Sequence, residues 1–141
     1  MNAVEREAYN LEQAVDTNTY YIGQSAVAIQ TYYDQIIKEE TTINQVNTDI
    51  GRLSTLVDDA YNGVMDQNTS VSGSEYFVQA ISEAIDKAKG YHEVGTQSQT
   101  DIGIYASWIL YEYDLIDQYA VIIDQKKREM DELYNRYIIA T

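Results

Sequence analysis

The sequence predicts an all-α fold: an elongated helical hairpin or bundle with coiled-coil-like heptad packing, built from two long helices and one short helix. The 141 residues include no proline, whereas average usage would give about seven, and proline is the residue that interrupts a helix most strongly. Aliphatic residues also recur every seven positions in both halves of the chain. Two stretches rich in glycine, serine and threonine, residues 68–74 and 90–100, separate the periodic segments. The length fits a single domain, residues 1–141.

The first long helix is predicted over residues 3–67. From Ala8 onward every seventh residue is aliphatic, and this column forms the predicted packing seam: Val15, Ile22, Ile29, Ile36, Ile43, Ile50, Val57 and Val64. A straight α-helix drifts by ~20° per heptad against such a repeat, so the column either drives a left-handed supercoil or is interrupted. An interruption is expected near residues 17–19 or at Gly51, where helix propensity is weakest.

A second column lies three residues after the first and is mixed in character. It consists of Leu11, Asn18, Ser25, Tyr32, Glu39, Val46, Leu53 and Ala60. A dimeric coiled coil has apolar residues throughout this column, whereas here the middle of the column is polar. The flanking positions carry Glu7, Glu12, Glu40 and Asp49 without a basic counterpart, so a parallel homodimer would bring like charges together. An antiparallel partner, or the chain's own second half, fits the seam better.

The short helix is predicted over residues 75–89, with Ser74 as its N-cap. The second long helix is predicted over residues 101–139, with Thr100 or Asp101 as its cap. Its part of the packing seam consists of Ile102, Ile109, Ile116 and Ile123. If the first helix is continuous the hairpin is a rod, and if it breaks the chain folds back into a four- or five-helix bundle.

Residues 102–123 are apolar on nearly every face of the predicted helix. A helix that is apolar all round is buried on all sides, and one antiparallel neighbour cannot cover it. The chain also has 14 tyrosines, a residue type enriched at protein interfaces. We therefore predict a partner interface at Tyr105, Trp108, Tyr111 and Tyr113. The alternative is the central helix of a monomeric bundle whose tyrosine hydroxyls reach water.

No catalytic, cofactor-binding or metal-binding residue is predicted. The single histidine, His92, falls in a predicted loop and cannot supply the several histidines of a zinc or di-iron site. The absence of cysteine excludes thiolate chemistry and disulfides. A calcium-loop register from Asp58 would put Ala60 and Thr69 where carboxylates belong, so a helix end is the favoured interpretation there. We expect a protein that is not an enzyme and that uses no cofactor.

Acidic residues outnumber basic ones 23 to 9, which gives a net charge of −14. Nucleic acids and anionic membranes are bound by clustered lysine and arginine, and the one such cluster, residues 126–128, is flanked by acids. Three carboxylates in the most apolar segment argue against a transmembrane helix, and the N-terminal residues lack the apolar core of a secretory signal. The expected partners are proteins or further copies of the chain, in a virion or in the cytoplasm.

The leading hypothesis is a non-enzymatic structural or assembly protein that acts through helix–helix packing in a multisubunit particle, such as a virion or tail. Two alternatives stay open. One is a small helical hairpin that is secreted without a cleaved signal, a role that long antiparallel helices would suit. The other is an acidic inhibitor that imitates nucleic acid, although its charge is spread along the chain instead of being concentrated in one segment.

Overall fold

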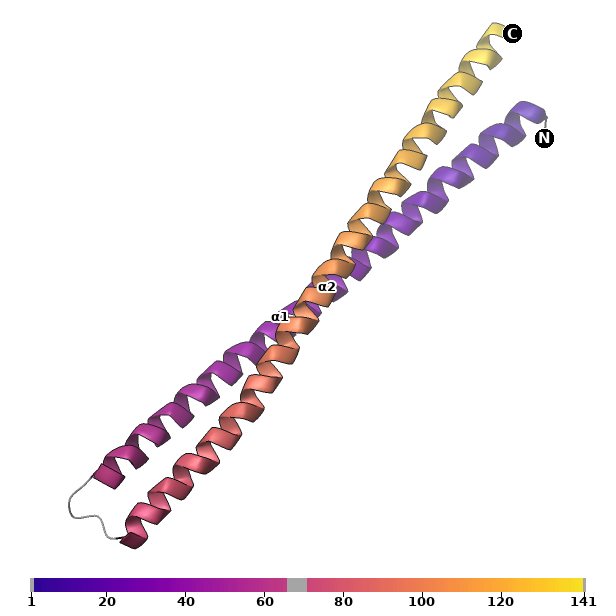
Figure 1. Ribbon diagram of the computed structural model, residues 1–141. Coiled ribbons are helices and arrows are strands. Elements are labelled where there is room, and N and C mark those ends of the chain that lie inside the picture. Colours follow the sequence, from indigo (N-terminus) through magenta and orange to yellow (C-terminus); the bar gives the residue numbers. More distant parts are fainter. Residues whose placement is uncertain (1, 66–70, 141) are drawn as a thin grey trace. The chain divides into compact units, whose positions relative to one another are not determined.

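The protein is all-α and consists of two helices packed against each other as a hairpin (Figure 1). The computed structural model describes all residues except 1, 66–70 and 141, and it describes only the backbone of residues 64, 71–74, 139 and 140. Helix α1 spans Ala3–Met65 and helix α2 spans Val71–Ala140. No strand occurs among the described residues, so the predicted fold class is confirmed.

The helix pair divides into two compact units. The first combines α1 as far as Asp34 with α2 from Tyr105 onward, and the second runs from Gln35 to Ile104. In the first unit the rings of Tyr21 and Tyr119 lie with their centroids 5.4 Å apart. Tyr32, eleven residues after Tyr21 on α1, contacts Trp108, which lies eleven residues before Tyr119 on α2. The two helices of this unit are therefore antiparallel.

The second unit has the same antiparallel arrangement. Val46 of α1 lies against Gly95 of α2, and Gly63, later on α1, lies against Phe77, earlier on α2. Burial repeats every seven residues in both units, because this spacing keeps the same side of each helix toward the other.

The deepest column of α1 is the mixed one that lies three residues after the aliphatic column. Five of its members are buried: Leu11, Ser25, Val46, Leu53 and Ala60. On α2 the corresponding buried residues are Ala84, Ser98 and Leu133. Small side chains such as Ser25 and Ser98, each no more than 5% exposed, let two helices approach closely without leaving a cavity.

The residues of the predicted packing seam lie next to this deepest column. Ile29 and Ile109 are buried, 7% and 6% exposed. The others are half-buried: Val15, Ile22, Ile36, Ile43, Ile50, Val57, Ile102, Ile116 and Ile123. The side chain of Val64 lies outside the described part of the chain. A two-helix pair cannot enclose both columns fully, and this is why most seam residues keep some exposure.

Helix α1 is continuous through both places where an interruption was expected, residues 17–19 and Gly51. The polar residues there bond to the helix itself. The Asn18 side-chain amide donates a hydrogen bond to the carbonyl of Ala14 at 2.7 Å, and the Thr19 hydroxyl donates to the carbonyl of Val15 at 2.8 Å. Their hydrogen-bonding groups are thus satisfied within the helix.

The predicted short helix, residues 75–89, and the predicted second long helix, residues 101–139, are parts of one helix, α2, which corrects the sequence-based boundaries. Thr100 is not a cap, because its hydroxyl donates to the carbonyl of Thr96, one turn earlier, at 3.1 Å. Packing outweighs weak helix propensity across 90–100, where Ser98 is buried in the seam.

Three further positions differ from the sequence-based expectation. Residues 71–74 were predicted as part of a turn and instead form the first turn of α2. Ser74, the predicted cap, therefore lies inside the helix, while the turn predicted at 68–70 lies outside the described residues. His92 is an exposed residue of α2 and not a loop residue.

The start of α1 has a reciprocal cap that the sequence analysis did not identify. The backbone N–H of Glu5 donates to Oδ1 of Asn2 at 2.8 Å, and the backbone N–H of Asn2 donates to Oε2 of Glu5 at 3.3 Å. This arrangement is a capping box, which satisfies two backbone donors that the helix leaves free at its start.

Candidate interaction surface

An aromatic cluster joins the two helices near one end of the first unit. Tyr32 of α1 stacks on Tyr105 of α2 with ring centroids 6.3 Å apart, and Trp108 meets both rings, at 5.4 Å from Tyr32 and 5.5 Å from Tyr105. These contacts hold the indole on one side only, since Trp108 keeps 47% of its surface exposed. The cluster therefore fixes the orientation of a large apolar side chain that still faces outward.

The structure separates the four residues of the predicted partner interface. Tyr105 is half-buried within the aromatic cluster, whereas Trp108, Tyr111 and Tyr113 are exposed. Tyr113 forms a hydrogen bond with Tyr33 of α1, and this bond, together with electrostatic repulsion from Tyr33, raises the pKa of the Tyr113 phenol above its ordinary value. Trp108 and Tyr111 lie on a different side of the helix pair.

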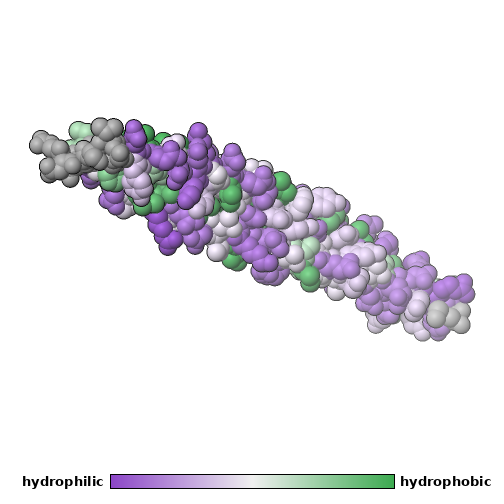
Figure 2. Space-filling model, turned by 90° about the horizontal axis from the view of Figure 1, so that it is seen from below, coloured by the Kyte–Doolittle hydropathy of each residue, from purple (hydrophilic) through white to green (hydrophobic). Residues whose placement is uncertain are grey.

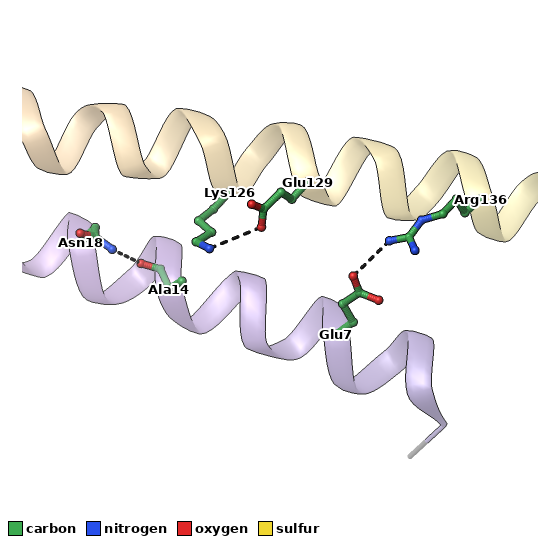
Figure 3. Close-up of polar contacts among 6 residues, drawn as sticks. All are labelled: Glu7, Ala14, Asn18, Lys126, Glu129 and Arg136. Atoms are coloured by element: carbon green, nitrogen blue, oxygen red, sulfur yellow. Dashed lines mark hydrogen bonds and ion pairs between the residues drawn. The ribbon is translucent and has the colours of Figure 1, made fainter.

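One ion pair identifies the residues that share the side of Trp108. Nη2 of Arg136 lies 3.1 Å from Oε1 of Glu7, so these two helix columns border each other on one side of the pair (Figure 3). Steps of seven residues from Glu7 lead to Ala14, Tyr21 and Ala28, and steps of seven back from Arg136 lead through Glu129 to Ile122, Leu115 and Trp108. The two columns therefore line the same face.

We call the part of this surface between Ala14 and Thr31 on α1 and between Trp108 and Ile122 on α2 the tryptophan face. Its members carry no charge, and Glu7, Glu129 and Arg136 lie beyond one end of it. It consists of Ala14, Thr17, Tyr21, Gln24, Ala28 and Thr31 on α1, and of Trp108, Tyr111, Leu115, Gln118 and Ile122 on α2. Four of its apolar side chains are exposed by 39–61%: Tyr21, Trp108, Tyr111 and Ile122. In a chain with 23 acidic residues, a face of this length without a carboxylate is distinctive.

The other side of the same unit is different in chemistry. Exposed carboxylates lie there at Asp16, Asp117 and Asp124, about 140–180° round their helices from Tyr21 or Trp108. Exposed apolar side chains on this side, such as Leu110, are interspersed with these charges. The two sides of the helix pair thus differ in charge although both expose apolar residues.

Polar residues occupy the seam beside the tryptophan face. Lys126 is half-buried, and its ammonium lies 3.4 Å from Oε2 of Glu129 on the same helix. Figure 3 shows the Lys126 side chain extending from α2 toward the segment of α1 that contains Asn18. A charged group at such a position specifies which partner helix and which register are tolerated, at some cost in stability.

Groups that could perform chemistry are not brought together. Within the residues that the structure describes, no group of three or more histidine, cysteine or acidic side chains could hold a metal ion. A groove of about 310 Å³ in the first unit is lined mainly by Val4, Ala8, Met130, Leu133 and Tyr137. Asn2 and Glu5 also line it, and none of its lining residues forms a nucleophile paired with a base.

No helix in the described part of the chain is long and apolar enough to cross a membrane. Apolar side chains nevertheless reach the surface throughout the molecule. Among the described side chains, eight apolar residues are buried while twenty-four large apolar residues are exposed. Figure 2 shows such residues between hydrophilic ones on the face in view. The helix pair alone therefore leaves more large apolar side chains exposed than it buries.

Sequence reasoning located Trp108 and Tyr111 but missed the face as a whole. The sequence does contain a sign of this face. At the seven-residue spacings that make up the face, residues 14–31 and 108–122 contain only uncharged side chains. Comparison of the chain with protein-family models, with curated proteins and with solved structures finds no match.

Proposed function

We propose that this chain is a non-enzymatic structural or assembly protein that acts by packing its helices against other protein surfaces in a multisubunit particle, such as a virion or tail. Its own two helices form a coiled-coil-like pair, and the partners are proteins or further copies of the chain. Neither nucleic acid nor membrane is among them, because acids flank the one basic cluster, residues 126–128, and the chain as a whole is strongly acidic.

The excess of exposed over buried large apolar residues carries this proposal. A soluble monomer exposes single apolar side chains without consequence, but contiguous apolar patches mark interaction sites. The tryptophan face is such a patch, with exposed Tyr21, Trp108, Tyr111 and Ile122 along one side of the first unit. Tryptophan and tyrosine are also the residues in which interface binding energy concentrates.

The mass of the full chain in solution, measured by sedimentation equilibrium over a wide concentration range, tests the proposal. We expect a mass above that of the 16.1 kDa monomer, rising with concentration toward a fixed multiple. A chain that stays monomeric at every concentration would contradict the proposal and favour an inhibitor that acts alone.

A further inference from the structure

We infer that the tryptophan face binds a second copy of this chain through the same face. The inference rests on the proposed assembly function and identifies both the surface and its occupant. Two hairpins packed in this way form a four-helix arrangement with an isologous interface, the commonest type in homo-oligomers.

The chemistry of the face restricts its occupant. Burying a charge without a partner costs several kcal/mol, so a surface that covers the tryptophan face must itself be uncharged. Its apolar residues must also extend over a similar length, because Trp108 and Ile122 are separated by four turns of helix, about 21 Å. The tryptophan face of a second copy meets both requirements.

The exposed area is sufficient for a dimer. The four exposed apolar side chains of the face present about 400 Å². Threonine and glutamine side chains at its edge, such as Thr17, Gln24 and Gln118, are exposed too and would form an uncharged polar rim. Together they bring the face near the ~800 Å² per partner that a standard interface buries.

The anchor of the face is already ordered. The rings of Tyr32 and Tyr105 fix the indole of Trp108 from the seam side. A side chain that is held before association loses less rotamer freedom when a partner covers it, and this favours binding. Glu112, which follows Tyr111 in the sequence, occupies a seam position and is half-buried in the single chain, and Glu129 lies seven residues beyond Ile122.

Cross-linking tests the inference directly, because the chain has no cysteine of its own. Gln118→Cys places a single thiol on the tryptophan face, and Gln30→Cys, the matched control, places one on the opposite side, about 180° round α1 from Tyr21. Each variant is treated at low concentration with a bismaleimide that spans no more than two helix diameters, about 20 Å. We expect a covalent dimer from Gln118→Cys and at least about fivefold less from Gln30→Cys.

A charge variant provides an independent measurement. Gln118→Glu would bring like charges into the interface of both copies, so we expect the dissociation constant of the dimer to rise by about tenfold or more. Gln30→Glu is the control. It adds a carboxylate beside Asp34, to which the Gln30 amide donates a hydrogen bond at 3.0 Å, and it should leave the dissociation constant unchanged.

The outcomes separate this inference from the proposed function. If the wild type associates but Gln30→Cys cross-links as well as Gln118→Cys, or Gln118→Glu keeps the wild-type dissociation constant, the tryptophan face is not the interface and only the inference is wrong. If the wild type is monomeric at every concentration, both the inference and the proposed function fail.

Discussion

Gly95 of α2 lies so close to Val46 of α1 that a Cβ atom at position 95 would meet Cγ1 of Val46 at 3.5 Å. This is an ordinary van der Waals separation, so an alanine fits there. Replacing a helical glycine by alanine gains about 0.5–1 kcal/mol from backbone entropy. We therefore expect Gly95→Ala to raise the free energy of unfolding by about that amount, as measured by urea denaturation.

Gly63 provides the opposite case on α1. A Cβ atom there would lie 2.6 Å from two ring carbons of Phe77, so the ring must move. Overpacking of this kind costs ~1–3 kcal/mol and offsets the gain in helix propensity. Gly63→Ala should therefore show no gain or a net loss in the same denaturation experiment. Equal stabilisation by the two substitutions would show that the α1–α2 contacts described for the second unit are wrong.

Two neighbouring residues of α2 should differ strongly in their contribution to stability. Ile109 is 6% exposed in the seam, whereas Leu110 is 67% exposed. Ile109→Ala leaves a cavity between the helices and should lower the free energy of unfolding by about 2–4 kcal/mol. Leu110→Ala should change it by no more than about 0.5 kcal/mol. Similar losses for both variants in denaturant titrations would mean that the seam runs along another side of α2.

The hydrogen bond between Tyr33 and Tyr113 predicts a stability change at high pH. It raises the pKa of Tyr113 in the folded state, whereas an unfolded tyrosine titrates near ~10. The contribution of the pair is therefore complete below pH ~10 and is lost as the pH rises through the folded-state pKa. We expect the melting temperature of the wild type to fall relative to that of Tyr113→Phe above this pH.

Tyr111→Phe serves as the control for this titration, because it leaves the Tyr33–Tyr113 pair intact. It should follow the wild-type pH profile. If Tyr113→Phe also follows the wild-type profile, the hydrogen bond to Tyr33 has no influence on stability.

Salt should strengthen self-association. Each copy carries a net charge of −14, so two copies repel, while the tryptophan face contributes no ion pair that salt could weaken. Screening lengths fall from ~30 Å at 0.01 M to ~8 Å at 0.15 M ionic strength. We expect the dissociation constant, measured by sedimentation velocity, to fall over this range. A dissociation constant that rises with salt would indicate an interface held by ion pairs.

The seven-residue aliphatic column and the absence of proline predicted an all-α fold with an antiparallel seam, and left open whether it was a hairpin or a bundle. They did not show that the adjacent column, which contains Ser25 and Ala60, is buried more deeply. Small residues look unremarkable in a sequence, yet they fill a narrow space between two helices efficiently. The continuity of α2 was missed for a related reason, since local propensity at 90–100 favours a turn and only the packing of Gly95 and Ser98 outweighs it.

The extent of the tryptophan face, as a structural feature, was predicted only in part. An excess of tyrosine and an all-round apolar segment drew attention to Trp108 and Tyr111. Helix spacing alone puts Tyr113 about 140° round α2 from Trp108, but only the structure shows that it meets Tyr33 of α1. The extent of the face also requires both helices, because the pairing of Glu7 with Arg136 shows which columns of α1 and α2 share one side.

The double substitution Trp108→Ala with Tyr111→Ala tests the central claim most directly, that these residues serve association and not the fold. Both side chains are exposed, by 47% and 61%, although Trp108 also contacts Tyr32 and Tyr105. Circular dichroism and sedimentation equilibrium on the same sample should show wild-type helicity with a lower association state, because interface energy concentrates in such residues. A variant that melts as early as Ile109→Ala while keeping the wild-type mass at all concentrations would contradict the claim and assign both residues to the fold.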